Sequence, residues 1–370
     1  MDTNPIIRQV VAQHQHWMYR EASKGVAASD RDYRAMANSI ASVVRSVLPE
    51  LSNAERYALL RGQYTTGALR EIRDDISGSV TGYVESLKAS VEAQGKALAE
   101  YESSFAVRLL SQIATDISNP SIDPTGVYKE ALRKPVMGML YNDMLQDVDT
   151  STKRMAFQSI RNGISTGATN DEIAKALCGT KKNKNIDGLL NRTRSQAEMI
   201  VRTTRNQVAN EAYQQTYSAL GVSKVALCAT LDGRTSKYCA AHDGDIYDID
   251  SDFPRPPYHP HCRTVLIPVE DGIPFKRRRG NTSFKSIGKM NKEERQNIDY
   301  SDVDGMSYEE WFSHQDSDFQ KTWLGPVRYK LYKDGGFSLK KFADPVGGEY
   351  TIEELRERDE QTFNSLFGKA

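Results

Sequence analysis

Apolar residues recur every three or four positions through the first third of the chain, which predicts helices. The longest such run lies within 66–118, where the average spacing of about 3.6 residues is that of a straight helix rather than of a sustained coiled coil. Gln94 fills the one vacant position of the run. Gly78, Gly82 and Gly95 each cost about 1 kcal/mol relative to Ala in a helix, so the run can divide into two helices. An intramolecular hairpin is the favoured use of this stripe, and contact with other subunits is the alternative.

Shorter helices are expected on either side of that run. Residues 6–65 predict several, with a break at Pro49 and a further helix start at Ser52, whose Glu three positions later completes a capping pattern. The two prolines and the glycine within 119–126 indicate a domain boundary. Helices resume over 127–147, 150–164 and 169–178, and they are followed by a polar loop at 180–187.

The pattern changes at the end of a further helix, expected at 189–220. Apolar residues then alternate at Val225, Leu227 and Ala229, which predicts a strand. Segments 247–249 and 265–267 can supply two more strands. We therefore expect a small antiparallel sheet after the long helix.

The chain becomes polar after residue 270. Lys276, Arg277, Arg278 and Arg279 form a basic run that would touch phosphates of nucleic acid, although such runs are more often solvated loops. An aromatic helical segment follows at 311–332. Four successive regions are thus expected: a helical region (1–118), a central domain (125–272), a basic and polar linker (273–305) and a C-terminal aromatic docking segment (306–370).

Composition limits the class of protein. The 370 residues contain 49 Lys plus Arg and 49 Asp plus Glu, so no overall charge draws the chain to nucleic acid or membrane. Four cysteines are too few for a disulfide framework and fit a reducing compartment. The first residues lack the pattern of a signal peptide, and no apolar run has the length of a membrane span.

Cysteine and histidine are concentrated in one short stretch. Three of the six histidines and two of the four cysteines lie within 239–262. Cys239-x-x-His242 and His259-x-x-Cys262 have the spacing of two zinc knuckles, with His261 as a substitute for His259. A site with four ligands is closed and structural, which predicts no catalysis. A packed hairpin with merely buried cysteines is the alternative to a metal, and a nuclease using His259, His261 and Asp243 is a minor one.

The order of several motifs resembles the phage head morphogenesis family, the minor head proteins related to protein F of phage Mu. The resemblance covers about 130–270 and rests on the following residues: Arg202, Thr203, Asp232, Arg234, Thr235, Cys239, Asp243, Gly244, Pro256, Pro257, His259, Pro260, Cys262 and Arg263. Family members often carry two further cysteines, where this chain has Ser236 and Thr264. A zinc site made only of cysteines is therefore impossible here.

The resemblance implies a structural protein of a tailed bacteriophage that acts in procapsid and head assembly at the portal vertex, with a role in DNA packaging or ejection. It implies a place inside the virion head after synthesis in the host cytoplasm. The portal protein is the expected partner, and scaffolding protein, major capsid protein, genomic DNA and further copies of the chain are additional candidates. The competing hypothesis is an enzyme, either a metal-dependent nuclease or a phage-delivered effector. The expected fold is α+β and predominantly helical, with a small antiparallel sheet around the Cys/His cluster and structural zinc as its cofactor.

Overall fold

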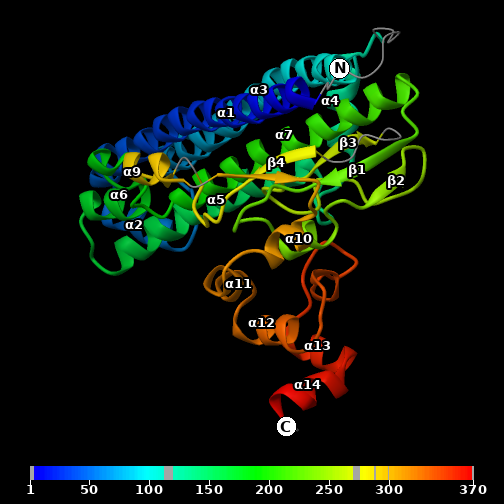
Figure 1. Ribbon diagram of the computed structural model, residues 1–370. Helices are drawn as coiled ribbons and strands as arrows, with labels where there is room; N and C mark the ends of the chain where they lie inside the picture. The colour runs from blue at the N-terminus through cyan, green and yellow to red at the C-terminus, as the bar shows by residue number, and fades with distance from the viewer. Residues whose placement is uncertain (1–3, 112–119, 270–275, 287–288, 299, 369–370) are drawn as a thin grey trace. The chain divides into compact units, whose positions relative to one another are not determined.

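The computed structural model describes residues 4–111, 120–269, 276–286, 289–298 and 300–368, and it divides into two compact units. Each unit is assembled from separated segments, whereas the sequence suggested four successive regions. Helices α1 (Asn4–Ser46), α3 (Gly67–Leu110) and α7 (Asn191–Ala219) contribute residues to both units (Figure 1). Unit 1 comprises 1–20, 96–138 and 205–370, and unit 2 comprises 21–95 and 139–204.

The regular elements of unit 2 are all helices in the part of the chain that the structure describes. Besides its parts of the three long helices, it contains η1 (Leu48–Glu50), α2 (Asn53–Leu60), α5 (Tyr141–Ser165), α6 (Asn170–Cys178) and η2 (Lys181–Asn183). The apolar stripe of α3 forms part of its core, because the side chains from Leu69 to Val91 in that stripe are all buried. The helix starts predicted at Ser52 and Thr169 are confirmed, since each residue forms a capping box with the glutamate three positions later.

Two expectations about the long helices are wrong. The segment 4–46 forms one helix of 43 residues rather than several short ones, and α3 runs unbroken for 44 residues through its glycines. Burying a large aliphatic side chain stabilises a fold by about 1.5–3 kcal/mol, which exceeds the cost of about 1 kcal/mol for each glycine. The buried stripe therefore keeps α3 continuous.

The small sheet predicted from the alternating pattern is present in unit 1. Its strands are β1 (Lys224–Cys228), β2 (Ile246–Asp248) and β3 (Val265–Val269), in the order β2-β1-β3 with antiparallel pairing throughout. Val225 lies opposite Tyr247 on one side and Pro268 on the other. Helix α8 (Lys237–Ala241) follows β1, and α4 (Pro124–Arg133) also belongs to this unit. The predicted fold class, predominantly helical with a small antiparallel sheet, is confirmed.

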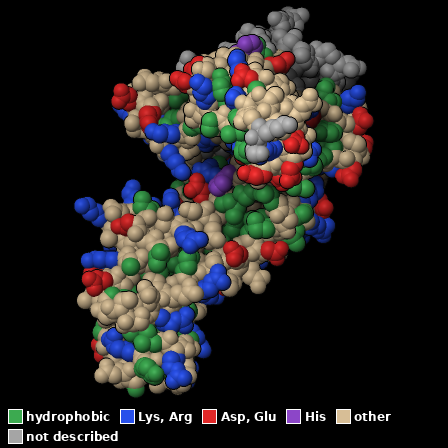
Figure 2. All heavy atoms as spheres, turned by 90° about the horizontal axis from the view of Figure 1, so that it is seen from below, with side chains coloured by type: hydrophobic (Ala, Val, Ile, Leu, Met, Phe, Trp, Pro, Cys, Tyr) green, Lys and Arg blue, Asp and Glu red, His purple; other side chains and the backbone are tan. Residues whose placement is uncertain are grey.

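The segment expected to be a polar linker contains regular structure. β4 (Lys276–Gly280) pairs antiparallel with β5 (Ser301–Asp304), and α9 (Lys292–Gln296) lies between them in sequence. The basic run 276–279 thus lies in a strand and not in a loop, because its backbone groups pair with those of β5. The side chains of its four basic residues lie outside the described part of the structure. On the face drawn in Figure 2, positive and negative side chains are interspersed, as the zero net charge leads one to expect.

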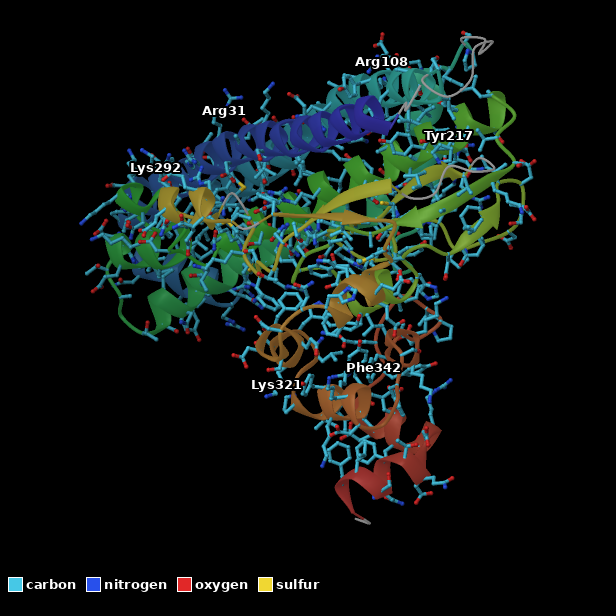
Figure 3. The ribbon with its side chains drawn as sticks, in the orientation of Figure 1. Arg31, Arg108, Tyr217, Lys292, Lys321 and Phe342 are labelled. Carbon is cyan, nitrogen blue, oxygen red and sulfur yellow. The ribbon has the colours of Figure 1, made fainter. Side chains whose placement is uncertain are left out.

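The C-terminal aromatic segment is part of the unit 1 core. It forms α10 (Tyr308–Ser313), α11 (Ser317–Leu324), α12 (Pro326–Lys333), η4 (Leu339–Phe342), α13 (Ile352–Arg358) and α14 (Glu360–Phe367). Tyr308, Phe312 and Phe342, the last labelled in Figure 3, have no solvent-exposed surface. They cluster with residues of α7 and the sheet. The aromatic side chains therefore pack within the chain itself, which differs from the docking role expected for them.

Candidate metal centre and family motif

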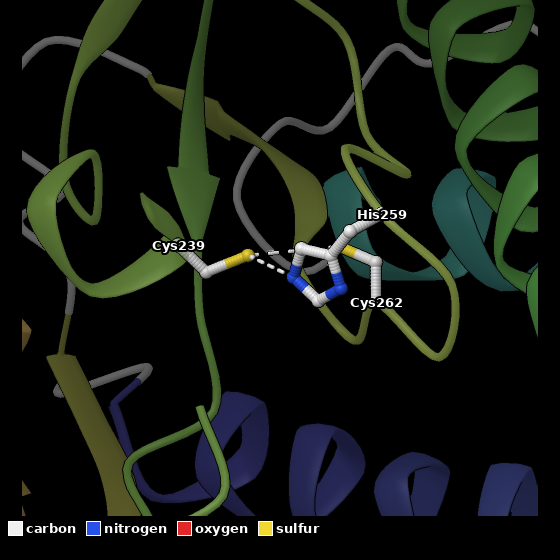
Figure 4. A group of neighbouring side chains, drawn as sticks. All are labelled: Cys239, His259 and Cys262. Atoms are coloured by element: carbon white, nitrogen blue, oxygen red, sulfur yellow. Dashed lines mark hydrogen bonds between the residues drawn. The ribbon is translucent and has the colours of Figure 1, made fainter. Parts of the chain in front are cut away.

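Helix α8 and the loop before β3 bring two cysteines together. The Ser236 hydroxyl caps α8 by accepting a hydrogen bond of 3.1 Å from the backbone N–H of Cys239, which fixes this cysteine on the first turn. The backbone N–H of Cys262 donates to the carbonyl of His259 at 3.1 Å, so the second knuckle is a tight turn. Cys239 and Cys262 are buried, and His259 is half-buried (Figure 4).

The three side chains have distances suited to a tetrahedral metal ion. The sulfur atoms of Cys239 and Cys262 are 3.7 Å apart, and Cys239 Sγ lies 3.2 Å from His259 Nε2. All three potential ligand atoms lie within 4.8 Å of one another. Zn–S bonds of about 2.3 Å and a Zn–N bond of about 2.1 Å in a tetrahedron place sulfurs about 3.8 Å apart and sulfur and nitrogen about 3.6 Å apart. The Cys239–Cys262 and Cys239–His259 separations each lie within a few tenths of an ångström of these values.

The tautomer of His259 supports the same fit. Its Nδ1 lies 2.8 Å from the carbonyl oxygen of Pro260, which can only accept a hydrogen bond, so Nδ1 carries the proton. The lone pair of Nε2 then faces the Cys239 thiol and the Ser236 hydroxyl, which lie 3.2 Å and 2.9 Å away. Histidine ligands of metals commonly donate their other ring N–H to a carbonyl in this way.

The two thiols differ in acidity. The Cys262 side chain lowers the pKa of Cys239 to about 7, assisted by the Ser236 hydroxyl and opposed by burial. Burial raises the pKa of Cys262 well above its ordinary value. Because the thiolate is the form that binds metals, Cys239 is the first of the two thiols to become available as the pH rises.

The other predicted ligands are not part of this group. His242 ends α8, and its Nδ1 lies 2.8 Å from the carboxylate of Asp245, to which Lys340 also donates a hydrogen bond. His261 is exposed and has a positive φ of 60°. The structure thus brings together Cys239, His259 and Cys262 and leaves His242 and His261 outside the set.

Ser236 lies beside the three candidate ligands. Its hydroxyl lies 2.9 Å from His259 Nε2, at one of the two positions where relatives often carry cysteine. Thr264, at the other position, is buried. An oxygen at Ser236 offers a weaker zinc ligand than a thiolate, so the group holds two sulfurs and one nitrogen with a hydroxyl or water as the fourth candidate.

The family motif residues form a separate buried ion-pair network. Arg263 donates two hydrogen bonds of 2.6 Å to the carboxylate of Asp232 and one of 3.2 Å to the Thr235 hydroxyl. Arg234 adds a contact of 3.1 Å to Asp232. Burial raises the pKa of Asp232, but the hydrogen bonds and charges of Arg263 and Arg234 outweigh burial, so the pKa is lowered. This network ties the loop after β1 to the strand that follows the metal group.

Asp243 also has a structural role. Its carboxylate accepts hydrogen bonds from the backbone N–H of Ala229 at 2.7 Å and of Tyr308 at 2.6 Å. Gly244 follows with a φ of +89°, a conformation that glycine adopts without strain, and its N–H pairs with the carbonyl of Leu227. The Asp-Gly pair of the motif therefore follows the end of α8 and starts the return to β2. Pro260 supplies the carbonyl that orients His259.

Two further residues of the motif lie in the other unit. Arg202 pairs with Glu198 at 2.9 Å on α7, and Thr203 is buried; both belong to unit 2. Asn206 and Asn210 lie on the same helix and are not among the motif residues. Both donate to the carbonyl of Thr264, and Asn210 also accepts from the N–H of Leu266. Two asparagines one turn apart on an apolar helix face were the sequence signal that could have indicated this buried contact with the backbone before β3.

Comparison with known proteins agrees with the motif pattern. Residues 157–267 match the family model described as Phage Mu protein F like protein. The matched segment is similar to that family over less than a third of the chain. The match confirms the resemblance and includes both the ion-pair network and the metal group. No curated protein and no solved structure matches the chain. The match supports the prediction of a phage head morphogenesis protein.

Proposed function

We propose that this protein is a minor head protein of a tailed bacteriophage that acts in head assembly at the portal vertex. The observation that carries the proposal is the family match, which spans α7, the sheet and the Asp232–Arg263 network. No helix among the described residues is both long and apolar enough to cross a membrane. The proposal places the protein inside the virion head, and no residue is assigned a catalytic role.

The long helices are the proposed contact elements. At a rise of 1.5 Å per residue, helices of this length extend over about 65 Å, enough to span several neighbouring subunits of an assembly. The portal protein is the first proposed partner. Scaffolding protein, major capsid protein and genomic DNA are further partners, and the protein would assist packaging or ejection of that DNA.

Quantitative mass spectrometry of purified procapsids and mature virions tests this role. We expect a few copies per particle in both, because a portal-associated protein follows the symmetry of one vertex. A phage lacking the gene should yield particles with defective heads. Absence from both particles, with the protein free in the lysate, would overturn the proposal and favour an effector.

We further propose that Cys239, His259 and Cys262 hold a structural zinc ion. The donor set, the sulfur separation and the Nδ1 hydrogen bond of His259 support zinc. A bound ion would cross-link α8 to the loop before β3 and stabilise a sheet of only three short strands. Metal analysis of protein purified without added chelator tests this proposal, and we expect close to one zinc per chain. Protein that contains no zinc, and whose melting temperature is the same with and without a chelator, would refute it.

The nuclease alternative draws less support from the geometry. Asp243, its proposed carboxylate, is engaged by two backbone N–H groups rather than directed at the histidines. An assay of supercoiled plasmid with Mg²⁺, Mn²⁺ or Zn²⁺ discriminates the two functions. Metal-dependent cleavage that is lost in His259→Ala would restore the enzyme hypothesis.

A further inference from the structure

The loop between α6 and α7 is held rigidly by its own polar side chains. We call residues 180–187 the basic loop. The carboxylate of Asp187 accepts three hydrogen bonds, from the N–H and hydroxyl of Thr180 and from the amide of Asn183, at 2.7–2.8 Å. These bonds lower the pKa of Asp187 to about 2. The single acidic side chain of the loop is thus occupied in fixing its shape.

The base of the loop is equally constrained. Asn185 is buried in the left-handed conformation, where its amide donates to the carbonyl of Cys178 at 2.9 Å and its carbonyl accepts from the Tyr33 hydroxyl at 2.7 Å. Gly179 and Gly188 touch so closely that a Cβ on either would clash with the backbone of the other. The loop therefore needs little further ordering when a partner binds, which favours affinity.

This rigid frame presents positive charge to solvent. Lys181, Lys182 and Lys184 are exposed, as is Arg192 at the start of α7. None of the four makes an ion pair with a residue that the structure describes, in contrast to Lys175 nearby in the sequence, which pairs with Asp171 at 2.6 Å. Four unpaired cations within twelve residues form a concentrated positive surface in a chain with zero net charge.

Two aliphatic side chains lie among these cations. Ile186 and Leu189 are each 50% exposed, although Leu190 beside them is fully buried. Leu189 and Arg192 line an open hollow of about 570 Å³ together with Ser195, Gln196 and Asp187, whose carboxylate is engaged by Thr180 and Asn183. An apolar centre with a charged rim is the usual composition of a protein-binding surface, whereas a phosphate backbone offers nothing to bury against isoleucine and leucine.

We propose that the basic loop, with Leu189 and Arg192, binds an acidic protein segment that carries aliphatic residues. The acidic side chains would pair with the lysines and Arg192, and the aliphatic residues would cover Ile186 and Leu189 and enter the hollow. This inference rests on unit 2 alone and does not depend on the proposed place of the protein at the portal.

A panel of fluorescein-labelled peptides tests the proposal with the full-length purified chain. The peptides are twelve residues long, rich in Asp and Glu, and carry two leucines at every spacing from one to four. We expect at least one peptide to bind with an affinity that falls as salt is raised. We expect the same peptide with serines in place of its leucines to bind about tenfold more weakly.

Two double variants separate charge from apolar contact. Lys181→Glu/Lys182→Glu should weaken peptide binding about tenfold or more through charge repulsion. Ile186→Ser/Leu189→Ser should weaken it by a similar factor while leaving the charge unchanged. Arg31→Glu/Lys88→Glu is the matched control, because both residues are exposed on other helices and Arg31 points away from α1 (Figure 3). Its binding should stay close to that of the original chain.

The outcomes decide between partner classes. Failure of every peptide to bind, or equal binding by Ile186→Ser/Leu189→Ser, would overturn the proposal. A labelled duplex DNA of thirty base pairs serves as the competing probe. Tighter binding of this DNA than of every peptide, lost on reversal of the lysines but retained in the serine variant, would identify the loop as a phosphate-binding surface instead.

Discussion

Arg263 holds the carboxylate of Asp232 with two parallel hydrogen bonds of 2.6 Å across a sequence separation of 31 residues. The bonds connect the loop after β1 to the residue next to Cys262. The backbone carbonyl of Asp232 also accepts from the Tyr308 hydroxyl at 2.9 Å, so the C-terminal segment joins the same structure. These motif residues therefore link three segments of the chain next to the candidate metal centre.

Replacing Asp232 by Asn should lower the free energy of unfolding by about 1.5–3 kcal/mol, because the half-buried Arg263 would lose two charge-assisted hydrogen bonds to a buried carboxylate. Urea unfolding followed by circular dichroism measures the change. Asp74→Asn is the control, since its pair with Arg73 is exposed and screened by solvent, so its loss should change stability far less. A loss at Asp232 as small as the control's would contradict a structural role for the pair.

The same pair predicts a dependence of stability on acid. The folded-state pKa of Asp232 is lowered, so its stabilising contribution is present above the unfolded-state pKa of about 3.9 and is lost as pH falls through the folded-state value. The original chain should therefore lose more stability between pH 5 and pH 2 than Asp232→Asn does. Parallel curves for both proteins would show that another group controls the acid response.

Packing between α5 and α6 depends on Gly163. A Cβ at this position would overlap the side chain of Ile173, so Gly163→Ala should lower stability by about 1–3 kcal/mol despite the better helix propensity of alanine. Adding Ile173→Val removes Cδ1, one of the two obstructing carbons, and should restore part of the loss. Gly78→Ala is the matched control, because no atom lies within 4 Å of its added Cβ, and it should be neutral or stabilising. Thermal unfolding of the four proteins measures these effects.

The aromatic segment should prove necessary for unit 1 to fold. Trp323 is buried and donates a hydrogen bond of 3.0 Å to the carbonyl of Thr235, so Trp323→Ala should cost about 3–5 kcal/mol. Val346→Ala is the comparison, since Val346 is 83% exposed and should change stability by less than about 0.5 kcal/mol. Near-ultraviolet circular dichroism and thermal melting report the loss of packing. An unchanged melting temperature for Trp323→Ala would favour an independent docking segment.

Zinc affinity should respond to the sulfur count at the candidate centre. Ser236→Cys adds a thiol 2.9 Å from His259 Nε2 and should tighten zinc binding by at least about tenfold, whereas Cys262→Ser should abolish it. Competition with a chromophoric chelator measures both. Cys178→Ser is the control, because Cys178 belongs to unit 2 and should leave zinc content unchanged. Equal zinc content in all four proteins would place the metal elsewhere.

Periodicity and local motifs determined the secondary structure of this protein well. The apolar stripe on α3, the capping boxes at Ser52 and Thr169 and the alternation through β1 each depend on residues close in sequence, and the structure confirms them. The spacing of the cysteines and histidines also located the candidate centre. Its composition was less certain, because spacing does not decide whether His242 turns toward the cysteines or toward Asp245.

Tertiary structure decided the features that depend on distant residues. Helix α3 remains unbroken because its apolar stripe is buried. The stabilisation comes from tertiary packing, which helix propensity does not include. The aromatic segment reads as a docking surface until Tyr308 and Trp323 are placed against the backbone of Asp232 and Thr235. The basic run 276–279 pairs with a strand more than twenty residues later, although its composition favours a loop. The aromatic segment is therefore placed by hydrophobic burial, and the basic run is placed by backbone pairing with β5. Both interactions join residues that are remote in sequence, so the local sequence does not reveal them.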